Sequence, residues 1–165
     1  HPASEGVDYA LYLKGLVNFN ENLGLFSWVA KQDLSERDQK AARNSFEAFN
    51  ELVTRFPDSR YTPDGRSRMV YIVNALSQYE VHVARYYHSR GAHVAAINRA
   101  QAALTDYPNT PALEEALYIM VKSYDAMGMA QLRDDTARVL EKNFPQSAYL
   151  ARGFKQKDVP WWKLW

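Results

Sequence analysis

Phe56-Pro57-Asp58-Ser59 has the order aromatic, proline, polar, hydroxyl, and the same order returns twice further along the chain. The later copies are Tyr107-Pro108-Asn109-Thr110 and Phe144-Pro145-Gln146-Ser147, and each copy follows an amphipathic stretch. The two later prolines lie 37 residues apart, as do Gly91 and Gly128. A period of this length indicates a repeat architecture in which each unit packs against the next.

Each repeat is predicted to consist of two helices that are joined at a glycine and closed by a proline. Glycine accepts the left-handed conformation that follows many helices, and proline cannot continue a helix. The most regular copy has a first helix at about 112–127, with Leu113 and Met120 on one apolar face, and a second helix at about 130–143. The middle copy has its second helix at about 92–106.

The first copy is less regular, with helices predicted at about 5–22 and 38–55. Residues 23–37 form an insertion between them that contains Phe26 and Trp28. A solvated loop seldom carries so many apolar side chains, so part of the insertion must be covered. The cover is either the repeat itself or a partner protein, and in the second case Phe26 and Trp28 belong to an interface.

One long helix is predicted over about 61–90, because no glycine or proline interrupts the apolar pattern after Gly65. At 1.5 Å per residue, the roughly 26 residues from Gly65 onward extend roughly 40 Å, which exceeds the length of one hairpin. Such a helix either spans two layers of the stack or projects beyond it. A projecting helix would offer Tyr71, Tyr79 and Tyr86 to neighbouring chains.

The predicted fold class is therefore all-α, a tetratricopeptide-type solenoid of about three helical hairpins. One solenoid domain is expected over residues 1–165. Its parts are a hairpin at 1–59 with the inserted loop 23–37, a hairpin at 60–108 with a long first helix, a hairpin at 109–145, and a tail at 146–165.

The composition excludes several classes of function. Lys and Arg total 20 against 19 for Asp and Glu, so the basic footprint of a nucleic-acid binder is missing. Cysteine is absent, which excludes disulfides, thiolate metal sites and a cysteine nucleophile. No run of residues is long and apolar enough for a membrane span, and the start has no signal-peptide pattern. Because the first residue is His1, the chain is expected to be a mature form or part of a longer protein.

Catalytic and metal-binding patterns are also missing. The histidines lie at 1, 82, 88 and 93, and their spacings match no zinc motif. The acidic pair Glu114-Glu115 is adjacent in sequence, so its side chains diverge, and we expect it on a solvated face at the positive end of a helix. Neither an enzyme, nor a cofactor, nor a metal site is expected.

The last five residues hold three of the four tryptophans, Trp161, Trp162 and Trp165. These side chains are predicted either to cap the apolar end of the last hairpin or to contact a lipid headgroup interface or a partner groove. Deleting residues 154–165 distinguishes the two, because only loss of a cap lowers the melting temperature.

Beyond the repeat, the chain resembles the BamD (ComL) family of outer-membrane assembly lipoproteins. The resemblance covers roughly residues 1–145, as the last three of the family's five repeats. It is carried by residues 8–16, by Phe46-x-x-Phe49-x-x-Leu52-Val53, by Phe56-Pro57-Asp58-Ser59-x-Tyr61, and by residues 84–99 around Arg90-Gly91-Ala92.

The resemblance implies a periplasmic protein at the inner face of the outer membrane, within the machine that inserts β-barrel proteins. The family's anchor is an N-terminal lipidated cysteine, which this chain does not contain. Its first two repeats, which receive unfolded outer-membrane proteins, would also lie outside this chain. The implied partners of the remaining repeats are a POTRA domain of the barrel subunit BamA and the accessory Bam lipoproteins.

By position in this resemblance, Arg90, Asn98 and Arg99 match the end of the family that faces BamA. Arg99 is the foremost candidate, because a guanidinium can fork onto a partner's carboxylate. Lys122 and Arg138 are further candidates in the last repeat. We expect Arg99→Glu to weaken binding of a POTRA fragment while leaving helical circular dichroism unchanged.

Two kinds of function therefore stand side by side, a scaffold within a protein assembly and a receptor that holds peptides in its concave groove. Peptide-binding repeats clamp a terminal carboxylate with basic and amide side chains from successive first helices. The corresponding faces here carry Tyr12, Lys14, Asn18, Tyr79, Arg85 and Lys122 without a repeating clamp. The scaffold is the preferred prediction.

Overall fold

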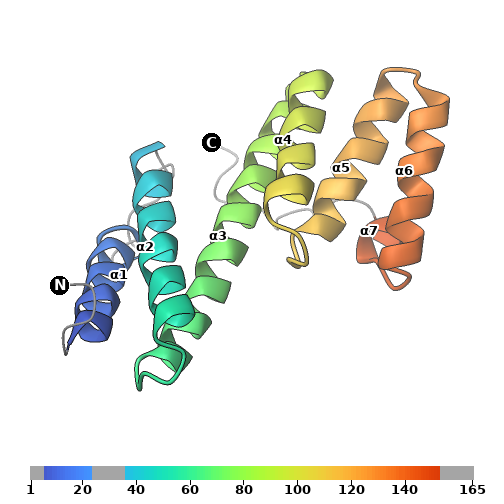
Figure 1. Cartoon of the computed structure of the whole chain (residues 1–165). Coiled ribbons are helices and arrows are strands. Elements are labelled where there is room, and N and C mark those ends of the chain that lie inside the picture. The colour runs from blue at the N-terminus through green and yellow to red at the C-terminus, as the bar shows by residue number, and fades with distance from the viewer. Residues whose placement is uncertain (1–5, 24–35, 153–165) are drawn as a thin grey trace, which may run out of the picture. The chain divides into compact units, whose positions relative to one another are not determined.

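The computed structural model describes residues 6–23 and 36–152 of the chain. Within these residues every regular element is an α-helix, and none is long and apolar enough to cross a membrane. The helices are α1 (Val7–Leu23), α2 (Glu36–Arg55), α3 (Thr62–Ser89), α4 (His93–Asp106), α5 (Leu113–Ala126), α6 (Ala130–Asn143) and α7 (Ala148–Arg152) (Figure 1). The predicted all-α fold of helical hairpins is confirmed.

The helix positions follow the repeat. The long helix is confirmed as the 28 residues of α3, and α6 has the predicted bounds. The chain divides into two compact units after Tyr79, which lies inside α3. The single solenoid domain stays a prediction, and each unit is described here by itself.

The three tetrapeptides form one kind of turn. In each copy the aromatic residue ends a helix by donating its N–H to the carbonyl four residues back, as Phe56 does to Leu52, Tyr107 to Ala103 and Phe144 to Leu140. The fourth residue then donates to the carbonyl of the aromatic residue, through the Ser59 N–H at 3.1 Å, the Thr110 hydroxyl at 3.2 Å and the Ser147 N–H at 3.0 Å. Proline fits between them because it has no N–H to satisfy.

In the first unit, α1 and α2 lie side by side, and Gly15 is the point of close approach (Figure 1). The Ser45 hydroxyl donates to the Gly15 carbonyl at 2.8 Å, and the fully buried Phe49 ring covers the same glycine. A Cβ atom at this position would lie 2.5 Å from Phe49, so only glycine lets the two helices approach this closely.

In the second unit, two glycines end helices in the same way. The Ala92 N–H donates to the Tyr87 carbonyl, and the Gly91 N–H donates to the His88 carbonyl. The same pair of bonds recurs 37 residues later, around Gly128. Gly91 and Gly128 have φ values of +76° and +70°, which is the left-handed conformation of the Schellman motif. The predicted role of both glycines is confirmed.

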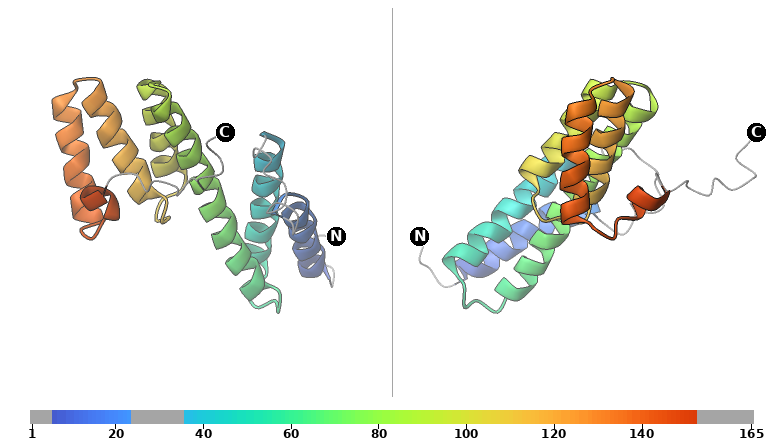
Figure 2. Two further views of the ribbon diagram at one scale, coloured as in Figure 1. Left: turned by 180° about the vertical axis from the view of Figure 1, so that it is seen from behind. Right: turned by 90° about the vertical axis from the view of Figure 1, so that its right-hand side faces the viewer.

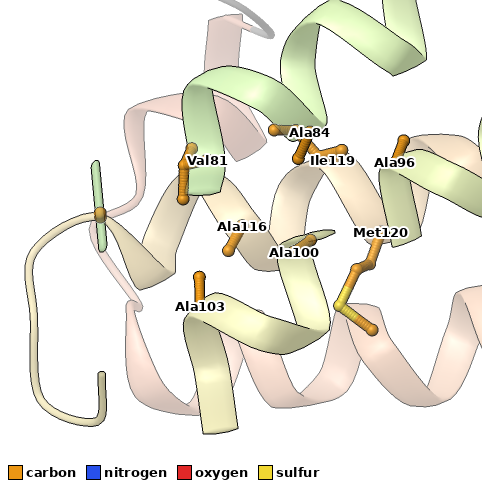
Figure 3. Packing of buried hydrophobic residues seen from close by; sticks show 9 residues of the cluster. Val81, Ala84, Ala96, Ala100, Ala103, Ala116, Ile119 and Met120 are labelled. Carbon is orange, nitrogen blue, oxygen red and sulfur yellow. The ribbon is translucent and has the colours of Figure 1, made fainter. Parts of the chain in front are cut away.

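The main buried cluster of the second unit is rich in alanine. Six of its nine residues are alanines, contributed by α3, by α4, by the residue before α5 and by α5 itself: Ala84, Ala96, Ala100, Ala103, Ala112 and Ala116. In Figure 3, Ala84, Ala96, Ala100, Ala103 and Ala116 gather in one cluster with Val81, Ile119 and Met120. Small side chains let helix axes approach closely, so the hairpins stack tightly around a thin apolar layer.

One short helix was not predicted. Residues 146–165 were expected to be a Trp-rich tail, but α7 occupies Ala148–Arg152 and lies against α5 at the end of the last hairpin (Figure 2). Tyr149 of α7 stacks on Tyr118 of α5 with 5.4 Å between the ring centroids. Five residues are too few to form a stable helix alone, so contacts of Tyr149 with α5, this stacking among them, hold α7 in place.

Candidate partner-binding surface

The turn between α3 and α4 presents an arginine on an aromatic ring. Arg90 follows the last residue of α3, and its guanidinium carbon lies 5.2 Å from the centre of the Tyr86 ring. Tyr86 in turn meets Tyr87 edge to face at 5.9 Å, and half of the Tyr86 side chain stays exposed. The Schellman turn fixes the backbone on which this pair stands (Figure 1).

The exposed face of α4 begins directly after this turn. Val94 is 58% exposed, and Asn98 lies one helical turn further on the same face, also exposed. We call Tyr86, Arg90, Val94 and Asn98 the Arg90 surface. It combines an aromatic ring, a guanidinium, an apolar side chain and an amide, which is the mixture typical of protein interfaces.

Arg99 is placed differently from Asn98. Its Nη1 atom lies 3.2 Å from Oε2 of Glu80, whose residue is only 5% exposed, while 46% of the Arg99 side chain is exposed. The arginine therefore neutralises a buried carboxylate of its own chain. Its binding role stays a prediction, but Arg99→Glu would set two carboxylates against each other and disturb the fold as well.

Lys122 and Arg138 lie on two other helices. Lys122 on α5 is 3.9 Å from Asp125, and Arg138 on α6 pairs with Asp135, three residues earlier. The Arg138 side chain is 72% exposed, and Met129 before α6 and Leu132 and Val139 within it are also exposed. These two basic residues are thus not joined to the Arg90 surface by any described contact.

Glu115 joins three helices in a network that the sequence did not reveal. The Arg85 guanidinium of α3 forks onto both of its oxygens, with Nη2 at 2.6 Å from Oε2, and the Tyr149 hydroxyl donates to Oε2 at 3.0 Å. Glu115 is 6% exposed, so the expected solvated position was wrong for this residue. Burial, with the Glu115 charge second, raises the pKa of Tyr149 to about 12.

In the first unit, tyrosines surround an open cavity of about 470 Å³ lined by Gly6, Asp8, Tyr9, Arg60 and Tyr61. Tyr61 stacks on Tyr12 at 4.9 Å and carries the Arg60 guanidinium at 4.8 Å. The Ser59 hydroxyl donates to Asp8 at 2.6 Å, and this bond, the largest cause, lowers the pKa of Asp8. The cavity wall is therefore held by bonds within the chain.

Four of the six side chains considered for a peptide clamp are bonded inside the chain. Tyr12 donates to Asp64 at 2.8 Å, and Asn18 donates to the Lys14 carbonyl of its own helix. Arg85 is bound to Glu115 and Lys122 to Asp125. These bonds compete with the capture of a peptide carboxylate. Phe26, Trp28, Trp161, Trp162 and Trp165 lie outside the described residues, and their contacts stay predictions.

Comparison with known proteins places the chain among outer membrane proteins. The family model for YfiO, described as an outer membrane lipoprotein, matches residues 1–140. Two relatives named outer membrane protein assembly factor BamD, from Neisseria meningitidis serogroup A and Neisseria gonorrhoeae, are 50% and 48% identical over the whole chain. A BamD from Pasteurella multocida is 36% identical over 87% of the chain and 55% of its own length. The chain spans 62% of the length of each of these Neisseria relatives.

Proposed function

Since the chain belongs to the YfiO family of outer membrane lipoproteins, we propose that it is a non-catalytic scaffold of the outer-membrane protein assembly machine, working at the periplasmic face of the outer membrane. In this proposal the Arg90 surface docks a POTRA domain of BamA. Accessory lipoproteins bind the last repeat, where α6 carries Arg138 and the exposed Leu132 and Val139. The relatives' name, outer membrane protein assembly factor, supports the assembly role.

The observation that carries the docking proposal is the exposed Tyr86–Arg90 pair on a turn with fixed backbone geometry. Tyrosine and arginine are the residue types that most often dominate binding energy in interfaces. The pair is ordered before binding, because the guanidinium already lies on the ring. A partner therefore loses less side-chain entropy than it would by ordering a free arginine.

A binding measurement with the purified chain and a soluble POTRA fragment of BamA tests this proposal. Arg90→Glu should weaken the affinity by about tenfold or more, as expected for an interface anchor. Arg66→Glu is the matched control, because Arg66 is an exposed arginine of the same helix within the first unit. Equal affinity of the two variants and the wild type would contradict docking through the Arg90 surface.

The alternative function is a receptor for short or unfolded segments in the concave groove. Because Arg85, Asn18 and Lys122 are bonded within the chain, this alternative has weaker support than the scaffold. Copurification from the cell envelope separates the two functions. Recovery of folded assembly subunits supports the scaffold, whereas recovery of peptides alone supports the receptor.

A further inference from the structure

Two histidines flank the turn that carries Arg90. His88 is in the last turn of α3 and His93 is the first residue of α4, and their rings meet edge to face with 5.2 Å between centroids. Nδ1 of His88 lies 2.9 Å from the hydroxyl of Ser123, which is fully buried in α5. The pair therefore connects three helices at one end of the second unit.

His93 contributes a polar atom that has nothing to bind. Its Nδ1 is buried and, in the described part of the chain, has no hydrogen-bond partner. A buried polar atom without a partner costs free energy in the folded chain.

The charges around His88 also oppose a proton. Burial, then His93 of α4, then Lys122 of α5 lower the pKa of His88. Asp125, which could offset Lys122, is shared between Lys122 and Arg133. Because the pKa of His88 is depressed in the folded chain, the unfolded chain binds more protons below about pH 6.5, and stability is lost as the pH falls through that range.

We propose that the His88–His93 pair is an acid-sensitive contact that closes the α3–α4 turn while the His88 ring is neutral and opens it when that ring gains a proton. A proton on His88 places a positive charge against the His93 ring and near Lys122, so the end of α3 separates from α4 and α5. The opening is local to this turn. It does not depend on the binding role proposed for the Arg90 surface, although it would alter the backbone on which Arg90 stands.

The molecule contains its own control, because the turn at Gly128 has the same two backbone bonds and no histidine pair. Amide hydrogen exchange by NMR measures both turns in one sample. Between about pH 7.5 and 5.5, the protection factors of Gly91 and Ala92 should fall roughly tenfold relative to those of Gly128 and Met129, the effect of about 1.4 kcal/mol.

Two variants complete the test. The double variant His88→Asn, His93→Phe keeps a polar group toward Ser123 and a ring at position 93. In this variant the two turns should respond equally to acid. If this double variant lacks the wild-type helical circular dichroism, His93→Phe alone decides, and the acid response must shrink. An equal response of both turns, no response at Gly91, or a full response in the variant overturns the proposal.

Discussion

The pair formed by Arg85 and Glu115 gives the sharpest prediction about stability. Arg85→Met keeps the length and apolar stem of the side chain but removes the fork that neutralises Glu115. Glu115 has 8% of its side chain exposed and would stay behind as a buried carboxylate, with Tyr149 as its remaining donor among the described residues. We therefore expect a large loss in the free energy of unfolding, although the substituted side chain is partly exposed.

The expected loss of stability can be worked out from the exposed fractions of the Arg85 and Glu115 side chains. Removing one partner of a buried ion pair costs about 3–5 kcal/mol. Here the Arg85 side chain is 39% exposed, so water can partly take the place of the lost guanidinium. The Tyr149 hydroxyl also still donates to Glu115. We therefore expect a loss of about 2–3 kcal/mol in the free energy of unfolding, or about 5–10 °C in Tm for a chain of this size.

Urea unfolding followed by circular dichroism measures this loss. Arg138→Met is the matched control, because Arg138 is 72% exposed in its pair with Asp135 and should cost less than about 0.5 kcal/mol. The double variant Arg85→Met, Glu115→Leu should recover most of the loss, since no buried charge remains. A loss below about 0.5 kcal/mol for Arg85→Met would refute the reasoning.

Three further predictions concern packing, titration and the second ion pair. Gly15→Ala should destabilise by about 1–3 kcal/mol in urea unfolding, because its Cβ would collide with Phe49, and a gain would contradict this account. Because the pKa of Tyr149 rises from 10.0 to about 12, the unfolded chain loses this proton first, so stability should fall between those pH values. In thermal melts at alkaline pH, Tyr149→Phe should reduce this fall of Tm with rising pH. The same fall in the variant and the wild type would contradict the assignment to Tyr149. A cycle of Arg99→Gln and Glu80→Gln should show a coupling of about 1 kcal/mol, and additive losses would mean that the 3.2 Å contact contributes nothing.

The helices could be predicted from the sequence because their ends are set by local chemistry. Gly91 and Gly128 take the left-handed conformation that a Schellman turn requires. The aromatic residue of each tetrapeptide closes a helix through its own N–H, and the proline stops continuation. These determinants lie within a few residues of one another, so a sequence displays them directly.

The pairing of charges could not be predicted in the same way. Arg85 and Glu115 are 30 residues apart, and whether they meet depends on how two helices are rotated about their axes. The same holds for Arg99 and Glu80, where one partner is buried and the other exposed. The helix of α7 was missed for a related reason, since its stability comes from Tyr149 stacking on a distant tyrosine.

The alanine core of the second unit has a mechanical consequence. Alanine has no rotamers, so the six alanines that share this layer with Val81, Ile119 and Met120 cannot adapt to a load by changing rotamers. At the alanine positions a load is met by sliding or separating whole helices, which breaks many contacts at once. The α3–α4 hairpin should therefore resist deformation. A force from a bound protein would be distributed over the whole alanine-rich layer rather than taken up by one side chain.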